Sequence, residues 1–176
     1  GVTNEGNGYE QVQCIAYSED GIHFEKYEGN PVLTAPEGIP TDMFRDPKVW
    51  KHEDTYYMVC GASRNNRGMA LLYRSKNMLN WEFFNVLAES RGEWGFMWEC
   101  PDFFDMDGQQ VMLVSPQEMQ ATPDGVFHAG FGTIALLGDY DEENHRFTRR
   151  DVQTVDDGLD FYAMQTTLAP DGRRIM

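Results

Sequence analysis

Short apolar and aromatic runs separated by polar turns dominate this chain, and the runs come in pairs. In the first pair the turn is Ser18-Glu19-Asp20-Gly21. Strongly aromatic and β-branched runs of this length are typical of strands, and a glycine in the turn favours a hairpin. Helical periodicity of useful length is absent, so the pattern predicts an all-β chain. The pairs are residues 11–17 with 23–27, 70–75 with 81–84, and 133–137 with 146–148.

A second set of hairpins lies between these pairs. They are expected at residues 47–50 with 55–60, at 102–104 with 110–115, and at 160–166 with 173–176, the last across a turn at 169–172. Together the two sets give antiparallel units of about four strands that repeat every ~60 residues, which is the sequence signature of β-propeller blades.

The charge of the chain limits its partners. A net charge of −15 argues against binding to nucleic acid or to anionic membranes. No apolar run approaches the ~18 residues of a membrane-spanning helix. The cysteines and histidines lack the spacing of metal ligands, and three widely separated cysteines favour a reducing, cytoplasmic compartment. We therefore expect no metal or cofactor.

Glu99 is the first candidate for chemistry, because it lies in an aromatic and sulfur-rich run directly before Cys100-Pro101. Burial against Phe96, Met97 and Trp98 would disfavour its carboxylate form and raise its pKa, as a general acid requires. The alternative is an exposed glutamate at the start of a strand.

A second stretch, residues 42–50, has the same layout of an acid, a proline and an apolar run. When Pro47 is aligned with Pro101, the residues that follow also match in kind. In a propeller the innermost strands start near the central axis, so Asp46, Glu99 and Asp160 from successive units are predicted to converge on one pocket. The alternative is that these acids only cap turns, and for Asp160 this is equally acceptable.

Two further sets of side chains have competing interpretations. Arg45 could bind a substrate hydroxyl or hold a carboxylate, although structural ion pairing is the commoner use of such an arginine. Trp50, Phe103 and Phe104 lie within strand interiors, and we expect them to pack between blades rather than to contact a substrate.

Three segments in this order and spacing resemble glycoside hydrolase family 32, which contains invertases, sucrose-6-phosphate hydrolases and fructan hydrolases. The similarity covers essentially the whole chain. It rests on Phe44-Arg45-Asp46-Pro47, on Trp98-Glu99-Cys100-Pro101-Asp102, and on residues 158–166, with additional similarity at residues 13–21 and 30–33.

The resemblance implies a five-bladed β-propeller with a central active site, usually followed by a β-sandwich. It implies a retaining hydrolase that releases fructose from sucrose, sucrose 6-phosphate or related fructosides. Glu99 would be the general acid/base and Asp46 the transition-state stabiliser, which must stay ionised. Arg45, Asp160 and Tyr162 would bind the fructosyl group.

The main departure from the family is that its nucleophile, an aspartate in an Asn-Asp-Pro segment, does not occur in this chain. The chain begins at Gly1 without a methionine and ends in what looks like half a hairpin. We therefore expect residues 1–176 to span the second blade to the start of the fourth, without the first blade and the β-sandwich. We expect this piece to be inactive alone and to self-associate through exposed sheet faces.

Two other functions remain open from the sequence. One is a non-catalytic carbohydrate-binding or interaction propeller. The other is a different five-bladed glycosidase that acts on arabinose or fructose polymers, against which the Arg-Asp-Pro and Glu-Cys segments argue by resemblance. Met164 stands where the family often has proline, which affects no catalytic residue.

Overall fold

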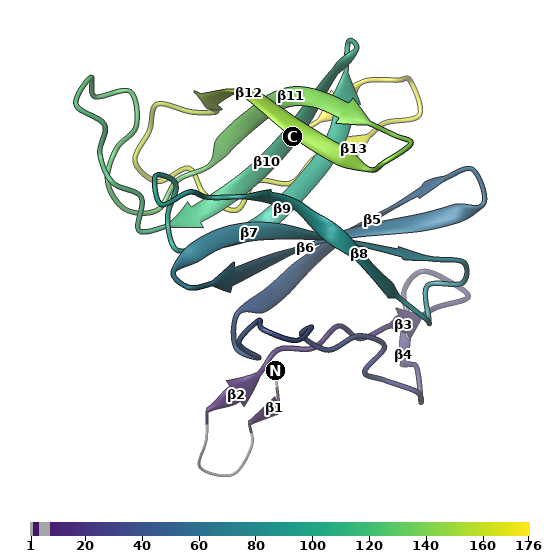
Figure 1. Ribbon diagram of the computed structural model, residues 1–176. Coiled ribbons are helices and arrows are strands. Elements are labelled where there is room, and N and C mark those ends of the chain that lie inside the picture. The colour runs from purple at the N-terminus through teal and green to yellow at the C-terminus, as the bar shows by residue number, and fades with distance from the viewer. Residues whose placement is uncertain (1, 4–7) are drawn as a thin grey trace.

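This computed structural model describes residues 2–3 and 8–176, which form an all-β structure as predicted (Figure 1). No helix long and apolar enough to cross a bilayer occurs in this part of the chain. The strands are β1 (Val2–Thr3), β2 (Tyr9–Glu10), β3 (Ala16–Tyr17), β4 (Glu25–Lys26), β5 (Phe44–His52), β6 (Thr55–Arg64), β7 (Arg67–Ser75), β8 (Glu82–Glu89), β9 (Met97–Met106), β10 (Gln109–Gln117), β11 (Ile134–Asp141), β12 (Arg146–Thr154), β13 (Thr167–Leu168) and β14 (Arg174–Ile175).

Two four-stranded antiparallel sheets, β5-β6-β7-β8 and β9-β10-β11-β12, make up most of the molecule. Each sheet is a meander, because every strand pairs with the next one along the chain. This confirms the four-stranded repeating units predicted from the sequence. Three two-stranded hairpins, β1-β2, β3-β4 and β13-β14, complete the fold. In Figure 1 the two large sheets lie one above the other, and the N-terminal hairpins lie beside the first.

The first strand of each large sheet carries the same irregularity. In β5 the register with β6 shifts between Arg45 and Lys48, and in β9 the register with β10 shifts between Glu99 and Asp102. In both strands two residues lie between these positions, and the second of them is a proline, Pro47 in β5 and Pro101 in β9. Proline cannot donate to a sheet ladder and is accommodated at a bulge. The alignment of the two prolines therefore predicted equivalent backbone positions correctly.

The two sheets pack through a shared apolar core centred on Trp98, which is completely buried. Its indole Nε1 donates to the carbonyl oxygen of Trp94 at 2.7 Å, so the buried polar atom is satisfied. Gly61 and Gly68 make room for this residue. A Cβ at Gly61 would lie 2.2 Å from the carbonyl oxygen of Trp98, and one at Gly68 would lie 2.3 Å from its ring. The close packing fixes β9, and with it Glu99, against the first sheet.

The predicted packing of the aromatic strand residues is confirmed, and whether they also contact a substrate stays a prediction. Trp50 and Phe103 face each other from the first strands of the two sheets, with ring centroids 6.0 Å apart. Phe104 belongs to a separate core on the other face of the second sheet, where it packs with Met164. These rings therefore join neighbouring layers.

The prediction of a strand at residues 160–166 is wrong. Only Thr167–Leu168 is a strand, and it pairs with Arg174–Ile175 across the predicted turn. The segment before it is held by side chains of the second sheet instead of by a ladder. The amide of Ala163 donates to Ser115 Oγ at 3.0 Å, and that of Thr166 donates to Asp102 Oδ2 at 2.9 Å. With a φ of 61°, Ala163 also interrupts an extended conformation.

Candidate active site

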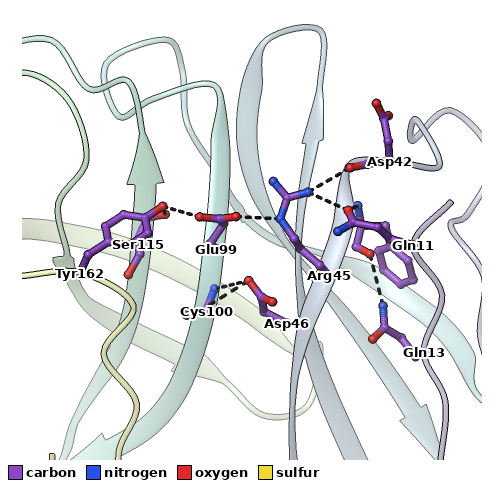
Figure 2. Close-up of polar contacts among 10 residues, drawn as sticks. Gln11, Gln13, Asp42, Arg45, Asp46, Glu99, Cys100, Ser115 and Tyr162 are labelled. Atoms are coloured by element: carbon purple, nitrogen blue, oxygen red, sulfur yellow. Dashed lines mark hydrogen bonds and ion pairs between the residues drawn. The ribbon is translucent and has the colours of Figure 1, made fainter. Parts of the chain in front are cut away.

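The carboxylate of Glu99 lies between two donors that come from different parts of the chain (Figure 2). Arg45 Nε donates to Glu99 Oε1 at 2.8 Å, and the hydroxyl of Tyr162 donates to Glu99 Oε2 at 2.5 Å. The side chains of Arg45 and Glu99 are each 17% exposed. This row of three side chains is thus partly desolvated yet still reachable from solvent.

Arg45 and Glu99 occupy the same position, before the bulge in the first strand of each large sheet, and Tyr162 lies in the segment before β13. Each is followed by a non-glycine residue with positive φ, a backbone conformation that is uncommon and that occurs preferentially at functional sites. These residues are Asp46 (57°), Cys100 (47°) and Ala163 (61°). The repeat therefore explains how Arg45 and Glu99, which are 54 positions apart, come to face one another, and Tyr162 joins them from 63 positions beyond Glu99.

Arg45 is fixed in this orientation by its second guanidinium nitrogen. Nη1 donates to Oε1 of Gln11 at 2.7 Å and to the carbonyl oxygen of Asp42 at 2.9 Å. Gln11 belongs to the N-terminal segment, which runs beside the first strand of the sheet. Nη1 of the guanidinium is thus held by Gln11 and Asp42, while Nε donates to Glu99.

Asp46 connects the two first strands directly below this row. Its Oδ2 accepts a hydrogen bond from the backbone amide of Cys100 at 3.1 Å, and the Cys100 thiol lies 3.6 Å from the same oxygen (Figure 2). Because Cys100 directly follows Glu99, this contact places the carboxylate of Asp46 close to the backbone that carries Glu99.

Burial raises the pKa of the Cys100 thiol to about 12, and the negative charge of Asp46 adds to this effect. A thiol with so high a pKa carries almost no thiolate near neutral pH, and the thiolate is the nucleophilic form. Cys100 is therefore unsuited to act as a nucleophile here.

The hydroxyl of Tyr162 is placed by the second sheet. It lies 3.2 Å from the carbonyl oxygen of Ser115, a residue of β10 that stands opposite Glu99 in the ladder. Ser115 Oγ accepts the amide of Ala163, the residue after Tyr162. Backbone and side chain of one serine therefore hold the tyrosine against Glu99.

The predicted upward shift in the pKa of Glu99 is wrong for this structure. Burial does raise it, but hydrogen bonds from Tyr162, Gln117 and Arg45, together with the charge of Arg45, outweigh burial and hold the pKa of Glu99 below its ordinary value. The aromatic run correctly indicated a desolvated acid. It gave no information on the donors, which come from distant segments.

The structure brings Arg45, Asp46, Glu99 and Tyr162 to one place, as the sequence predicted. Asp160 is exposed in a turn, and its side chain makes no hydrogen bond or ion pair with residues 2–3 or 8–176. Its predicted role in binding remains untested. Sequence reasoning missed three polar side chains that position the row: Gln11, Ser115 and Gln117.

Known proteins resemble this chain along its whole length. The family model "Glycosyl hydrolases family 32 N-terminal domain" matches residues 1–176. A sucrose-6-phosphate hydrolase of Bacillus subtilis is 39% identical over 99% of this chain and 37% of its own length. A raffinose invertase of Escherichia coli is 42% identical over 94% of this chain and 34% of its own length.

Solved structures agree with these sequence matches. A GH32 beta-fructofuranosidase of Bombyx mori has a TM-score of 0.89 at 43% identity, covering 98% of this chain and 37% of the other. A sucrose-6-phosphate hydrolase of Lactobacillus gasseri has a TM-score of 0.79 at 28% identity, covering 93% and 34%. The present chain thus spans just over a third of the length of the relatives it matches. From its fold, from the row of side chains around Glu99 and from these matches, the chain belongs to the N-terminal domain family of the family 32 glycosyl hydrolases.

Proposed function

We propose that this chain is part of the catalytic domain of a retaining glycosidase that releases fructose from sucrose, sucrose 6-phosphate or a related β-fructofuranoside. The observation that carries the proposal is the Glu99 carboxylate held between Arg45 and Tyr162. Asp46, in the bulge of β5, accepts a hydrogen bond from the amide of Cys100, the residue after Glu99. The names of the relatives, sucrose-6-phosphate hydrolase, raffinose invertase and beta-fructofuranosidase, supply the substrate class. A variant of the Bombyx mori enzyme is described in complex with sucrose.

In the first half of the reaction, protonated Glu99 gives its proton to the glycosidic oxygen while a carboxylate nucleophile attacks the anomeric carbon. The bond to the leaving group breaks, and a covalent fructosyl-enzyme forms. In retaining glycosidases the two carboxyl groups are ~5 Å apart. A second negative charge at that distance would raise the pKa of Glu99 and counteract the donors that lower it here.

In the second half, ionised Glu99 takes a proton from water while the water oxygen bonds to the anomeric carbon. The bond to the nucleophile then breaks, which frees its carboxylate and releases fructose. The hydrogen bonds from Tyr162 and Arg45 favour this ionised form. Positive charge develops on the sugar ring in both transition states, and the carboxylate of Asp46 would stabilise it electrostatically. Arg45 has donors in a fixed planar arrangement that suit a sugar hydroxyl as well as Glu99.

We assign sheet β5–β8 to the second blade of the propeller, sheet β9–β12 to the third, and β13–β14 to the start of the fourth. The nucleophile would then come from a first blade outside residues 1–176, since no Asn-Asp-Pro segment occurs within them. On this proposal the 176-residue chain does not turn over substrate by itself.

Fructose release tests the proposal. The full-length parent protein, its Glu99→Gln variant and the 176-residue chain are each given sucrose and sucrose 6-phosphate. We expect activity in the wild type alone. If the full-length protein binds these sugars but cleaves neither them nor any other fructoside, it is instead a carbohydrate-binding propeller. Fructose release by the 176-residue chain would place the nucleophile within that chain.

A cytoplasmic location is a second part of the proposal. It is supported by the cysteines, Cys14, Cys60 and Cys100, which are all free thiols in the structure. A count of reactive thiols in the denatured, unreduced protein purified from its source would test it. We expect every cysteine to react, and a disulfide between any two would contradict the proposal.

Self-association of the isolated chain is a third part. Ile22 is 77% exposed and Phe24 is 64% exposed, on the β3-β4 hairpin beside the first sheet. Large exposed apolar side chains favour contact with another protein surface. Light scattering of the isolated chain should show a mass above that of a monomer, and a monodisperse monomer would contradict this expectation.

A further inference from the structure

We propose that Asp102 is a positioning residue, which ties together the three segments that carry Arg45, Glu99 and Tyr162. Asp102 lies on β9, three residues after Glu99, and is not part of the row of side chains around it. The proposal deepens the proposed function and rests on it, because the property that Asp102 would control is the geometry of the general acid/base.

The burial of Asp102 is the first observation. Only 1% of the residue is exposed, although it ends in a carboxyl group. A buried carboxylate costs folding free energy unless charges and hydrogen bonds compensate it, and an apolar residue of similar volume often serves stability as well. The contacts that Asp102 makes compensate for this cost.

These contacts reach into both neighbouring units. Asp102 Oδ2 accepts hydrogen bonds from the amide of Thr166 at 2.9 Å and from its Oγ1 at 2.7 Å. The same oxygen lies 3.4 Å from Lys48 Nζ of the first sheet. Lys48 in turn donates to the carbonyl oxygen of Thr166 at 2.5 Å. The three residues thus form a closed triangle, in which each contacts the other two.

Each residue of this triangle follows a member of the row around Glu99 along the chain. Lys48 and Asp102 each stand three residues after a member of that row, Arg45 and Glu99, and Thr166 stands four residues after Tyr162. Two or three residues separate the two sets in each segment, and the first of these residues, Asp46, Cys100 or Ala163, has a positive φ. The triangle therefore joins all three segments close to the site. A second connection runs beside it, in which Gln165 Oε1 accepts from Lys48 Nζ at 3.2 Å and Gln165 Nε2 donates to the carbonyl oxygen of Cys100 at 2.9 Å.

The backbone between each residue of the triangle and its member of the row is short. If a residue of the triangle moved along its segment, the side chain of Arg45, Glu99 or Tyr162 on the same segment would move by nearly the same distance, since only three or four residues separate the two. Misplacement of a catalytic group by 1 Å costs on the order of a hundredfold in rate. The triangle therefore restrains two of the three side chains whose hydrogen bonds lower the pKa of Glu99, Arg45 and Tyr162.

A purely structural role would change stability and leave the ionisation of Glu99 unaltered, so the pH dependence separates the two. The groups that face the Glu99 carboxylate are Arg45 from β5, Gln117 from β10, Tyr162 from the segment before β13, and Cys100 beside it on β9. When the triangle is loosened, the donors withdraw and the pKa of Glu99 rises. The alkaline limb of kcat/KM, which reports the acid in the free enzyme, then moves to higher pH.

The experiment compares variants of the full-length parent protein. Asp102→Asn removes the charge, Thr166→Val removes one donor while keeping the shape, and Thr166→Ser keeps the donor. Asp139→Asn is the control, because its ion pair with Arg150 is 67% exposed on each side. For each variant the pH profile on sucrose and the thermal midpoint are measured. The titration of Glu99 is followed by NMR of carboxyl-labelled protein and assigned by its loss in Glu99→Gln.

We expect kcat/KM of Asp102→Asn to fall by about tenfold or more, with the alkaline limb and the Glu99 titration both at higher pH. Thr166→Val should show a smaller change in the same direction, and Thr166→Ser and Asp139→Asn should resemble wild type. Folded variants with lower thermal midpoints but an unchanged Glu99 titration would overturn the proposal. If wild type itself releases no fructose, the proposed function fails, and the NMR titration still decides the role of Asp102.

Discussion

Arg45 and Glu99 are 54 residues apart in the chain, yet Arg45 Nε lies 2.8 Å from Glu99 Oε1. Each is the residue before the bulge in the first strand of its own sheet. The pair is thus a direct product of the repeat, because two copies of one unit pack with their first strands adjacent. Its two side chains are only partly exposed, so the interaction is less screened than an ion pair at the surface.

Replacing Arg45 should change the ionisation of Glu99. Burial raises the pKa of Glu99, whereas Tyr162, Gln117 and Arg45 lower it. In Arg45→Met of the full-length protein the pKa of Glu99 should therefore rise, and the alkaline limb of kcat/KM should move to higher pH. The pH profile on sucrose measures this. If the alkaline limb of kcat/KM stayed at its wild-type pH, Arg45 would not set the pKa of Glu99.

Asp46→Asn should impair turnover more than substrate binding. Asparagine tolerates positive φ and keeps an oxygen for the amide of Cys100, so the bulge should survive. The negative charge opposite the developing positive charge is lost. We expect kcat to fall by on the order of a hundredfold or more, with a smaller change in KM. Steady-state kinetics tests this, and a large rise in KM with an unchanged kcat would contradict the assignment.

Gly61→Ala should destabilise the packing of the two sheets. The added Cβ would lie 2.2 Å from the carbonyl oxygen of Trp98, so the backbone of β9 must shift. We expect a loss of ~1–3 kcal/mol in the free energy of unfolding. Gly158→Ala is a suitable control, because its Cβ meets only the exposed side chain of Asp156. Denaturant unfolding of both variants measures the difference, and equal stabilities would contradict the packing argument.

The low pKa of Glu99 also predicts how stability depends on pH. A carboxyl group with a lowered pKa in the folded state contributes stability that is present above its unfolded value and is lost as the pH falls through the folded value. For Glu99 the ordinary value is 4.5, so the loss begins near that pH and continues below it. Thermal midpoints of the 176-residue chain, recorded from neutral pH downward, should fall less for its Glu99→Gln variant than for the unaltered chain. Parallel curves would show that the folded pKa is not lowered.

The repeat explains which parts of the fold could be predicted. Pro47 and Pro101 identified equivalent bulges because proline restricts the backbone locally, and that information is contained in a few residues. The segment before β13 was predicted wrongly as a strand because its conformation depends on residues that are distant in the sequence. Its backbone partners are Ser115 and Asp102, which no local pattern reveals.

The candidate site was predictable to the same extent. Glu99 stood out because its neighbours are aromatic, and Asp46 because its segment repeats that layout. Gln11 and Ser115 position the site through contacts over 34 and 47 residues, and nothing in their own surroundings distinguishes them from other polar residues. The pKa of Glu99 was predicted in the wrong direction for this reason, since burial is a local signal and hydrogen-bond donors are not.

The central claim is that Glu99 donates a proton to the leaving group, and its most direct test is the dependence of the Glu99→Gln variant on the leaving group. The full-length variant and wild type are compared on sucrose, which has a poor leaving group, and on an aryl β-fructofuranoside whose phenolate leaves without a proton. We predict that the variant loses on the order of a hundredfold or more on sucrose and much less on the aryl fructoside. An equal loss on both substrates, or an unchanged rate on sucrose, would contradict the assignment of Glu99 as the acid.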